Sequence, residues 1–176
     1  MMPSRRGRHR GRPRTDRVIV GLLVFFTVFN LTLELWYVLH SRRMTALVGH
    51  HWLADLWAFY ARADRFWVVS DWSLAQEGFN VFFTTLVNLW LIWAIRRGAS
   101  YRHALQLTLG AYMSYSVVLY FLSAHVGGYP GMAERTVANL ALFYGATLPW
   151  LIAHLYIAWD SFRVITGRFT SAIPGR

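Results

Sequence analysis

The chain has 176 residues, of which 56% are hydrophobic and 17% aromatic, and it contains no Cys. The absence of Cys excludes disulfides, thiolate catalysis and Cys-ligated metals. All 18 basic residues are Arg, and the formal net charge is +10. Such a hydrophobic fraction is unusual for a soluble domain and indicates a membrane protein, while the exclusive use of Arg fits a GC-rich bacterial genome.

The first segment, residues 1–17, holds seven Arg and almost nothing apolar. We expect it to be a disordered cytoplasmic tail, because it has too little apolar surface to form a core. One interpretation is that the tail binds nucleic acid. The favoured interpretation is that it is attracted to anionic lipid on the cytoplasmic side of a bilayer, with no nucleic-acid partner.

Four nearly charge-free stretches follow, each about 20 residues or longer, which is the length that crosses a hydrocarbon core as a helix. They are Val18–His40, Trp72–Ile95, Leu105–Ala124 and Thr136–Trp159. The predicted fold class is all-α: a polytopic membrane protein with four transmembrane helices in one domain, residues 18–165, and a cytoplasmic tail at 166–176.

The distribution of Arg predicts the orientation of these spans. The side that carries both termini holds 13 Arg, and the opposite side holds five. Because positive residues are enriched in cytoplasmic segments, both termini are expected in the cytoplasm, with the chain in a bacterial plasma membrane.

The loop between the first two spans, residues 41–71, contains apolar residues at helical spacing. They are Trp52, Leu53, Leu56, Trp57 and Tyr60. This pattern predicts a short amphipathic helix in the membrane interface. Two interpretations stay open: a loop that lies against the membrane, or a lid over a cavity that faces lipid.

Two carboxylates lie inside the predicted spans, where ionisable side chains are costly and mark function. Glu34 comes about six residues before the outer end of the first span, and Glu77 about as far after the outer start of the second. At about 1.5 Å per residue, both lie roughly 9 Å below the outer surface. We therefore expect the two side chains to face each other.

Polar residues accompany the glutamates along the faces of the predicted helices. With the aromatic Phe143 included, those at spacings of three and four residues are Thr27 and Asn30 in the first span, Asn80, Thr84 and Asn88 in the second, and Asn139, Phe143, Thr147, Trp150 and His154 in the fourth, while the third offers Ser114 and Tyr115. For Thr27, Thr84, Asn88 and Asn139 the favoured role is hydrogen bonding between helices.

Two adjacent buried carboxyl groups suit proton transfer, because one can stay protonated as an acid while the other stays ionised as a base. An electron-rich ring such as that of Trp150 can stabilise a cation. Acid, base and aromatic wall together predict carbocation chemistry on an apolar substrate, with no cofactor and no metal.

Four segments resemble the emopamil-binding protein family, which comprises the EXPERA domain proteins. They are LWAFYARADRFW, AQEGFNVFF, LQLTLGAYMSYSVVLYFLSAH and TLPWLIAHLYIAWDSF. The resemblance covers about Asn30 to Phe162 and is closest to the sterol Δ8–Δ7 isomerase branch, with the sigma-2 receptor as a relative. It implies a four-helix membrane fold, a hydrophobic lipid substrate and a homodimer.

The resemblance also implies site residues. Both family glutamates are kept, as Glu34 and Glu77, and the family Trp is kept as Trp150. A family His is replaced by Asn30, a Thr by Asn80 and an Asn by Thr147. With Tyr115, these residues are the candidates for contacting the substrate and stabilising a cation.

The lost His points away from the identical sterol reaction and towards double-bond migration or cyclisation of a terpenoid. The alternatives are a non-catalytic lipid-binding or trafficking protein of the sigma-2 type, and a small proton-coupled transporter, which the lack of broken helices and inverted repeats disfavours.

Overall fold

The structure is a computed structural model that describes residues 13–69 and 71–171. Within these residues it contains helices and no strands. Helix α1 begins at Pro13 and α9 ends at Ser171, so parts of both segments predicted as tails are helical. The rest of the predicted tails, residues 1–12 and 172–176, lies outside the described residues.

Nine α-helical segments are described, together with two π-helical turns and one 3₁₀ turn. The α-helices are α1 (Pro13–Phe29), α2 (Leu35–His40), α3 (Met44–Leu47), α4 (Trp52–Tyr60), α5 (Phe66–Val69), α6 (Asp71–Phe79), α7 (Thr85–Arg97), α8 (Arg102–Val126) and α9 (Val137–Ser171). The π-helical turns are Asn30–Glu34 and Asn80–Thr84, and the 3₁₀ turn is Ser41–Arg43.

Four of the described helical runs are long and apolar enough to cross a membrane: Arg14–Leu47, Asp71–Arg97, Arg102–Val126 and Val137–Arg168. They contain the first three predicted spans in full and the fourth from Val137 onward, so the prediction of an all-α polytopic membrane protein is confirmed. The predicted helix in the first outer loop is also confirmed, as α4.

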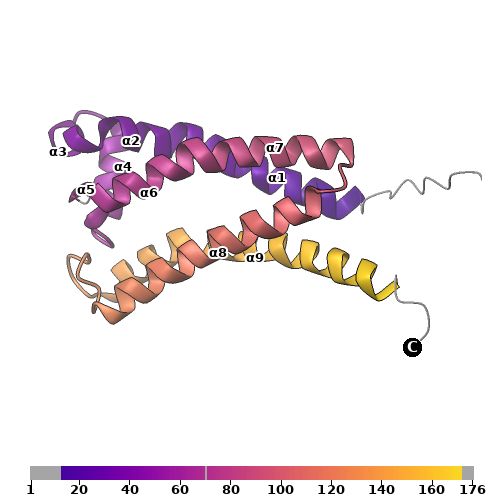
Figure 1. The fold of residues 1–176 in the computed structure, drawn as a ribbon. Helices are drawn as coiled ribbons and strands as arrows, with labels where there is room; N and C mark the ends of the chain where they lie inside the picture. The colour runs from indigo at the N-terminus through magenta and orange to yellow at the C-terminus, as the bar shows by residue number, and fades with distance from the viewer. Residues whose placement is uncertain (1–12, 70, 172–176) are drawn as a thin grey trace, which may run out of the picture.

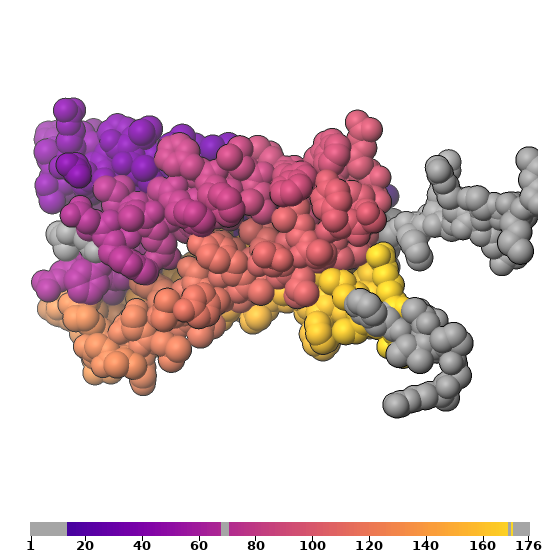
Figure 2. All heavy atoms as spheres, in the orientation of Figure 1, coloured from indigo at the N-terminus to yellow at the C-terminus, as the bar shows by residue number. Residues whose placement is uncertain are grey.

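The helices pack as two pairs, α1 with α7 and α8 with α9 (Figure 1). The pairs converge at the end where α1 begins and α9 ends, and they diverge towards the end that carries α3 to α6. In the space-filling view, side chains of α6 and α7 meet those of α8 along the middle of one face (Figure 2).

One apolar cluster at the convergent end joins all four runs. It consists of Ile19, Leu23, Phe26, Leu91, Ile95, Leu109, Met113 and Ile157, all nearly inaccessible to solvent. At the same end the Arg102 guanidinium donates to both carboxylate oxygens of Asp16, at 3.0 and 3.1 Å. This ion pair ties the first turn of α8 to α1, which holds the pairs together where they converge.

Helices α8 and α9 touch through a glycine. A Cβ on Gly110 would lie 2.7 Å from the His154 carbonyl oxygen and 2.8 Å from the Ala158 Cβ. Only a residue without a side chain permits this backbone approach, so Gly110 sets the closeness of the two helices.

The two π-helical turns lie side by side in the first two spans. In each, a backbone N–H bonds to the carbonyl five residues earlier: Leu35 to Asn30, and Thr85 to Asn80. Buried Asn30 joins the turns, because its Nδ2 donates to the Asn80 carbonyl and to Thr85 Oγ1, both at 3.2 Å. Such turns are rare and are found often at functional sites.

Candidate active site

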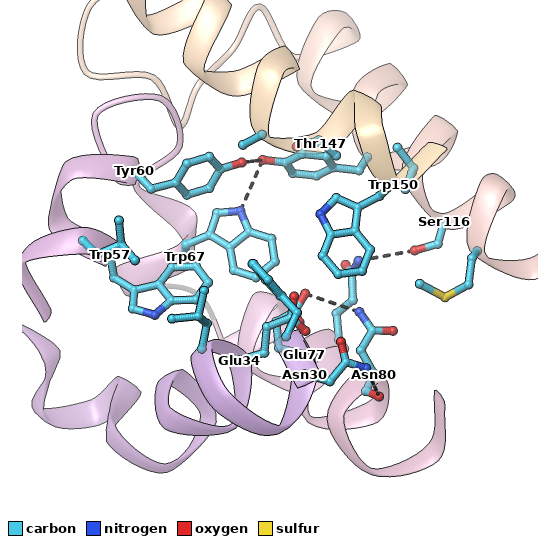
Figure 3. A pocket seen from close by; sticks show the side chains of 18 of the residues that line it. Asn30, Glu34, Trp57, Tyr60, Trp67, Glu77, Asn80, Ser116, Thr147 and Trp150 are labelled. Carbon is cyan, nitrogen blue, oxygen red and sulfur yellow. Dashed lines mark hydrogen bonds between the residues drawn. The ribbon is translucent and has the colours of Figure 1, made fainter. Parts of the chain in front are cut away.

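A cavity of about 410 Å³ opens between the diverging helix pairs, within the size range of small-molecule sites. Its wall is mainly aromatic and aliphatic, and both helix pairs contribute polar side chains to it (Figure 3). The lining residues are Phe29, Asn30, Leu33, Glu34, Leu56, Trp57, Phe59, Tyr60, Trp67, Gln76, Glu77, Asn80, Met113, Ser116, Val117, Tyr120, Leu142, Ala146, Thr147 and Trp150.

The structure brings the two predicted glutamates together in this cavity. Glu34 ends the first π-helical turn, and Glu77 lies one helical turn before the second. Their side chains interact with each other, and both line the cavity. Glu77 is only 3% exposed, whereas Glu34 is half-buried. Two carboxyl groups so placed cannot readily both ionise, so the pair is suited to hold one proton between them.

The two predicted asparagines support this pair in different ways. Asn80 Nδ2 donates to Glu77 Oε1 at 3.3 Å, which orients the carboxyl group from one helical turn away. Asn30 donates its amide protons to the Asn80 carbonyl and to Thr85 Oγ1, and so holds the two helix backbones together beside the glutamates. Both asparagines line the cavity and are at most 9% exposed.

Trp150 and Thr147 also reach the cavity from α9, on one helical face. The Trp150 ring stacks on Phe26 with a centroid distance of 4.6 Å and meets the edge of Phe29 at 5.1 Å. These contacts fix the ring as part of the wall. Thr147 Oγ1 donates to the Phe143 carbonyl at 3.0 Å, so the hydroxyl can bond further partners only as an acceptor. His154 lies outside the lining, 1% exposed, and stacks on Phe26.

Tyr115 is the predicted site residue that the structure places elsewhere. Its side chain is 65% exposed on α8 and does not line the cavity. The lining face of α8 instead carries Met113, Ser116, Val117 and Tyr120, spaced three and four residues apart. Neighbouring helix positions differ by about 100°, so a phase error of one residue moves a side chain from the cavity to lipid.

The lid interpretation of the outer loop agrees with the structure. Leu56, Trp57, Phe59 and Tyr60 of α4 line the cavity, and Trp67 joins them from α5. Helix α4 begins at a cap in which His51 Nδ1 accepts from the Leu53 N–H at 3.2 Å. The first outer loop therefore closes the cavity across the open end of the diverging helix pairs.

A second polar cluster, formed by Tyr60, Asp64, Trp67 and Tyr120, was missed by the sequence analysis. Tyr120 donates to Asp64 Oδ2 at 2.6 Å and accepts from Trp67 Nε1 at 3.2 Å. Burial raises the pKa of Asp64, an effect that hydrogen bonds from the Tyr120 hydroxyl and the Phe66 N–H partly oppose. Burial also raises the pKa of Tyr60. Asp64 and Tyr120 lie within quoted family segments, but nothing in their spacing indicates that they meet.

The prediction of interhelical hydrogen bonds is wrong for four residues. Among the described residues, the hydroxyls of Thr27 and Thr84 and both amide atoms of Asn88 are buried and find no hydrogen-bond partner. Asn139 is bonded locally, to the Glu134 carbonyl at 2.8 Å. Asn30 is instead the residue that bridges two helices.

The donor set of the site is poor in metal ligands. Within residues 13–69 and 71–171, no three His, Asp or Glu side chains are grouped closely enough to hold a metal ion. Among the described residues that line the cavity, none is cationic and two are acidic, Glu34 and Glu77.

Comparison with known proteins connects this geometry to a family. Residues 52–161 match the family model described as EBP: EXPERA (EXPanded EBP superfamily). A probable 3-beta-hydroxysteroid-Delta(8),Delta(7)-isomerase of Oryza sativa subsp. japonica is 28% identical over 116 residues, which cover 65% of this chain and 52% of the relative.

Two further relatives are an animal and a plant protein. The 3-beta-hydroxysteroid-Delta(8),Delta(7)-isomerase of Mus musculus is 26% identical over 142 residues, covering 80% of this chain and 61% of the relative. The isomeliandiol synthase of Ailanthus altissima is 29% identical over 118 residues, covering 66% and 56%. The chain thus spans roughly half to three fifths of the length of these relatives.

The family model covers well over half of the chain, including α4, both helices of the second span, α8 and the part of α9 that carries Thr147 and Trp150. The chain belongs to EXPERA, the EXPanded EBP superfamily.

Proposed function

We propose that this protein is a membrane-embedded isomerase or cyclase that acts on a sterol-like or terpenoid lipid through a carbocation. The observation that carries the proposal is the Glu34–Glu77 pair, which faces an otherwise apolar cavity. The names of the relatives, two hydroxysteroid isomerases and one synthase, support a reaction of this class.

The proposed step begins with the carboxyl group of the pair that carries the proton. That group protonates one carbon of a substrate double bond, whose electron pair forms the new C–H bond and leaves a cation on the neighbouring carbon. The other glutamate, as carboxylate, then removes a proton from an adjacent carbon, and the C–H electrons form the shifted double bond. In a cyclisation, a second double bond attacks the cation before the proton is lost.

The adjacency of the two glutamates allows the starting protonation state to be restored after each turnover. After one turnover, the carboxylate that accepted the proton is a carboxylic acid, and its partner is ionised. Because the two side chains contact each other, the proton can return directly between them, so no water needs to enter the apolar cavity. Trp150 lines the same space and stabilises the cationic intermediate through its ring.

The orientation and partners complete the proposal. The Arg bias supports termini in the cytoplasm of a bacterial plasma membrane, with the Arg-rich segment near anionic lipid. The family resemblance supports a homodimer, which light scattering of the purified protein would test.

The decisive experiment incubates the purified protein with a Δ8-unsaturated 3β-hydroxysteroid and, separately, with lipid extract from the source membrane. Products, which have the same mass as the substrate, are separated by chromatography, and mass spectrometry after reaction in D₂O gives the number of deuterons incorporated. We expect Glu77→Gln to lower turnover at least 100-fold, because it removes a proton carrier. Glu134→Gln, a control on the exposed outer loop, should keep wild-type turnover. Full activity of Glu77→Gln would refute the proposal.

The second candidate is a non-catalytic lipid-binding protein. It is favoured by the hydrogen bonds of Asn30. The amide protons of this residue bond to the Asn80 carbonyl and to Thr85 Oγ1, so they are not free for a substrate. This alternative predicts that a lipid incubated with wild-type protein is recovered unchanged, without incorporated deuterium.

A further inference from the structure

The cavity has a second polar end, distant from the glutamates. In Figure 3, Tyr60 and Thr147 lie on one side of the cavity, and Glu34, Glu77, Asn30 and Asn80 lie on the other. The rings of Trp67 and Trp150 lie between them. A ligand that fills the space therefore meets carboxyl groups at one end and hydroxyl groups at the other.

The hydrogen bonds of the hydroxyl end have a defined direction. Tyr120 donates its proton to Asp64 at 2.6 Å and accepts from Trp67. Since that proton is used, Tyr60 can bond Tyr120 only as a donor, and the oxygens are 3.4 Å apart, long for an O–H···O bond. Thr147 Oγ1 donates to the Phe143 carbonyl and offers lone pairs beside Tyr60. The Tyr60 hydroxyl thus interacts with both Tyr120 and Thr147. A ligand hydroxyl at this end would replace the Tyr60–Thr147 interaction and bridge the same two side chains.

From this arrangement we propose that Tyr60 and Thr147 bind a hydroxyl group at the end of the lipid opposite its reacting double bond. The ligand oxygen accepts from the Tyr60 hydroxyl, and its proton goes to Thr147 Oγ1. Tyr120 and Asp64 act as positioning residues that hold the phenol cluster in place. The inference rests on the proposed function for the identity of the ligand as an isoprenoid, and adds the group by which the lipid is recognised and oriented.

The charges around the cavity exclude other polar groups at this end. An anionic head group would find no cationic side chain in the lining, and a cationic one would be drawn to Glu34 and Glu77. A ketone could accept from Tyr60 but has no proton for Thr147. A hydroxyl is the neutral group that satisfies both oxygens, which makes the site selective for alcohols over their deoxy and oxo analogues.

The test measures binding and not turnover. Three probes are a Δ8 steroid with a 3β-hydroxyl, the same steroid with a 3-oxo group, and the 3-deoxy steroid, each added to purified full-length protein in detergent and followed by equilibrium dialysis. Wild type should bind the hydroxyl probe about 10-fold more tightly than the deoxy probe, the effect of two neutral hydrogen bonds. The oxo probe should fall between them.

Tyr60→Phe should reduce this preference to about 3-fold or less while leaving the affinity for the deoxy probe unchanged. Thr147→Val is the second variant, should Tyr60→Phe fold poorly, and it should bring the alcohol and the ketone to similar affinity. Tyr144→Phe is the matched control. It removes a hydroxyl that bonds to the Tyr129 hydroxyl, and neither of these residues lines the cavity. Its preference should equal that of wild type.

Equal binding of the three probes by wild type, or an unchanged preference in both Tyr60→Phe and Thr147→Val, would overturn the hydroxyl site. The same binding measurements on Glu77→Gln separate the two proposals, because this variant should still prefer the hydroxyl probe although it lacks turnover. Discrimination between the probes without turnover in wild type counts against the proposed catalysis alone, and turnover without discrimination counts against the hydroxyl site alone.

Discussion

Asn30 Nδ2 lies 3.2 Å from the backbone carbonyl oxygen of Asn80, and this hydrogen bond links two π-helical turns on neighbouring helices. The same nitrogen also donates to Thr85 Oγ1. The Asn80 carbonyl thus accepts twice, from the Thr85 N–H within its own turn and from Asn30 across the helices, which explains why an amide occupies a position at the base of the cavity.

We expect Asn30→Leu to destabilise the protein by about 1–3 kcal/mol, because the Asn80 carbonyl and Thr85 Oγ1 each lose a buried hydrogen bond. The melting temperature in detergent should fall accordingly. Thr32→Val is the control, since the Thr32 hydroxyl is exposed and bonds only to its own helix. A melting temperature equal to that of wild type in Asn30→Leu would show that the bond contributes nothing.

Asn88 provides the opposite case on the same helical stripe as Glu77. It is 0% exposed, and neither of its amide atoms has a hydrogen-bond partner within the described residues. Burial of an unsatisfied amide is costly, so Asn88→Leu, whose side chain branches at the same atom, should leave the melting temperature unchanged or raise it. A drop as large as that of Asn30→Leu would contradict this expectation.

The glycine contact between α8 and α9 gives a packing test. Gly110→Ala places a methyl group where His154 and Ala158 already lie, so we expect a loss of about 1–3 kcal/mol from displacement of the two helices. Gly145→Ala, in α9, meets nothing within 4 Å and should be neutral or slightly stabilising, because Ala favours helix. Thermal unfolding of both variants in one detergent compares them directly; similar melting temperatures would argue against the close contact.

Asp64 gives a prediction about pH. Burial raises its pKa above the ordinary value of 3.8, so the folded protein binds this proton more tightly than the unfolded chain. The resulting contribution to stability is complete below pH 3.8 and is lost as the pH rises through the raised pKa. Relative to Asp64→Asn, which does not titrate, the melting temperature of wild type should therefore fall as the pH rises from 3.8 through the raised pKa. A difference between the two proteins that does not vary with pH would refute this.

Hydropathy and helical spacing were enough to predict the spans, the glutamate pair and the polar stripe of the second span. Glu77, Asn80, Thr84 and Asn88 are all buried, as their spacing predicts. A strongly amphipathic stripe fixes the rotation of a helix, because several costly side chains must face inwards together.

The third span shows why the remainder was not predictable. Helix α8 has polar residues at several phases, and Ser114, Tyr115 and Ser116 follow one another, so the sequence does not select which of them faces the cavity. The Tyr60–Tyr120–Asp64 cluster depends on the return of the outer loop onto α8, a contact between residues about 60 positions apart. No local pattern encodes such a contact.

The π-helical turns also have a consequence for the length of the chain. Each accommodates one residue more than an α-helical turn would, so removal of a single residue within Asn30–Glu34 would let the first span relax to a regular helix. That deletion would leave the side chains on either side of it in their present directions, whereas tightening the turn to α without losing a residue would rotate one side by about 100° relative to the other. Glu34 and Phe26 now serve the cavity and the core from one continuous helix. With the extra residue present, that helix can serve both only while the turn at Asn30–Glu34 stays wide.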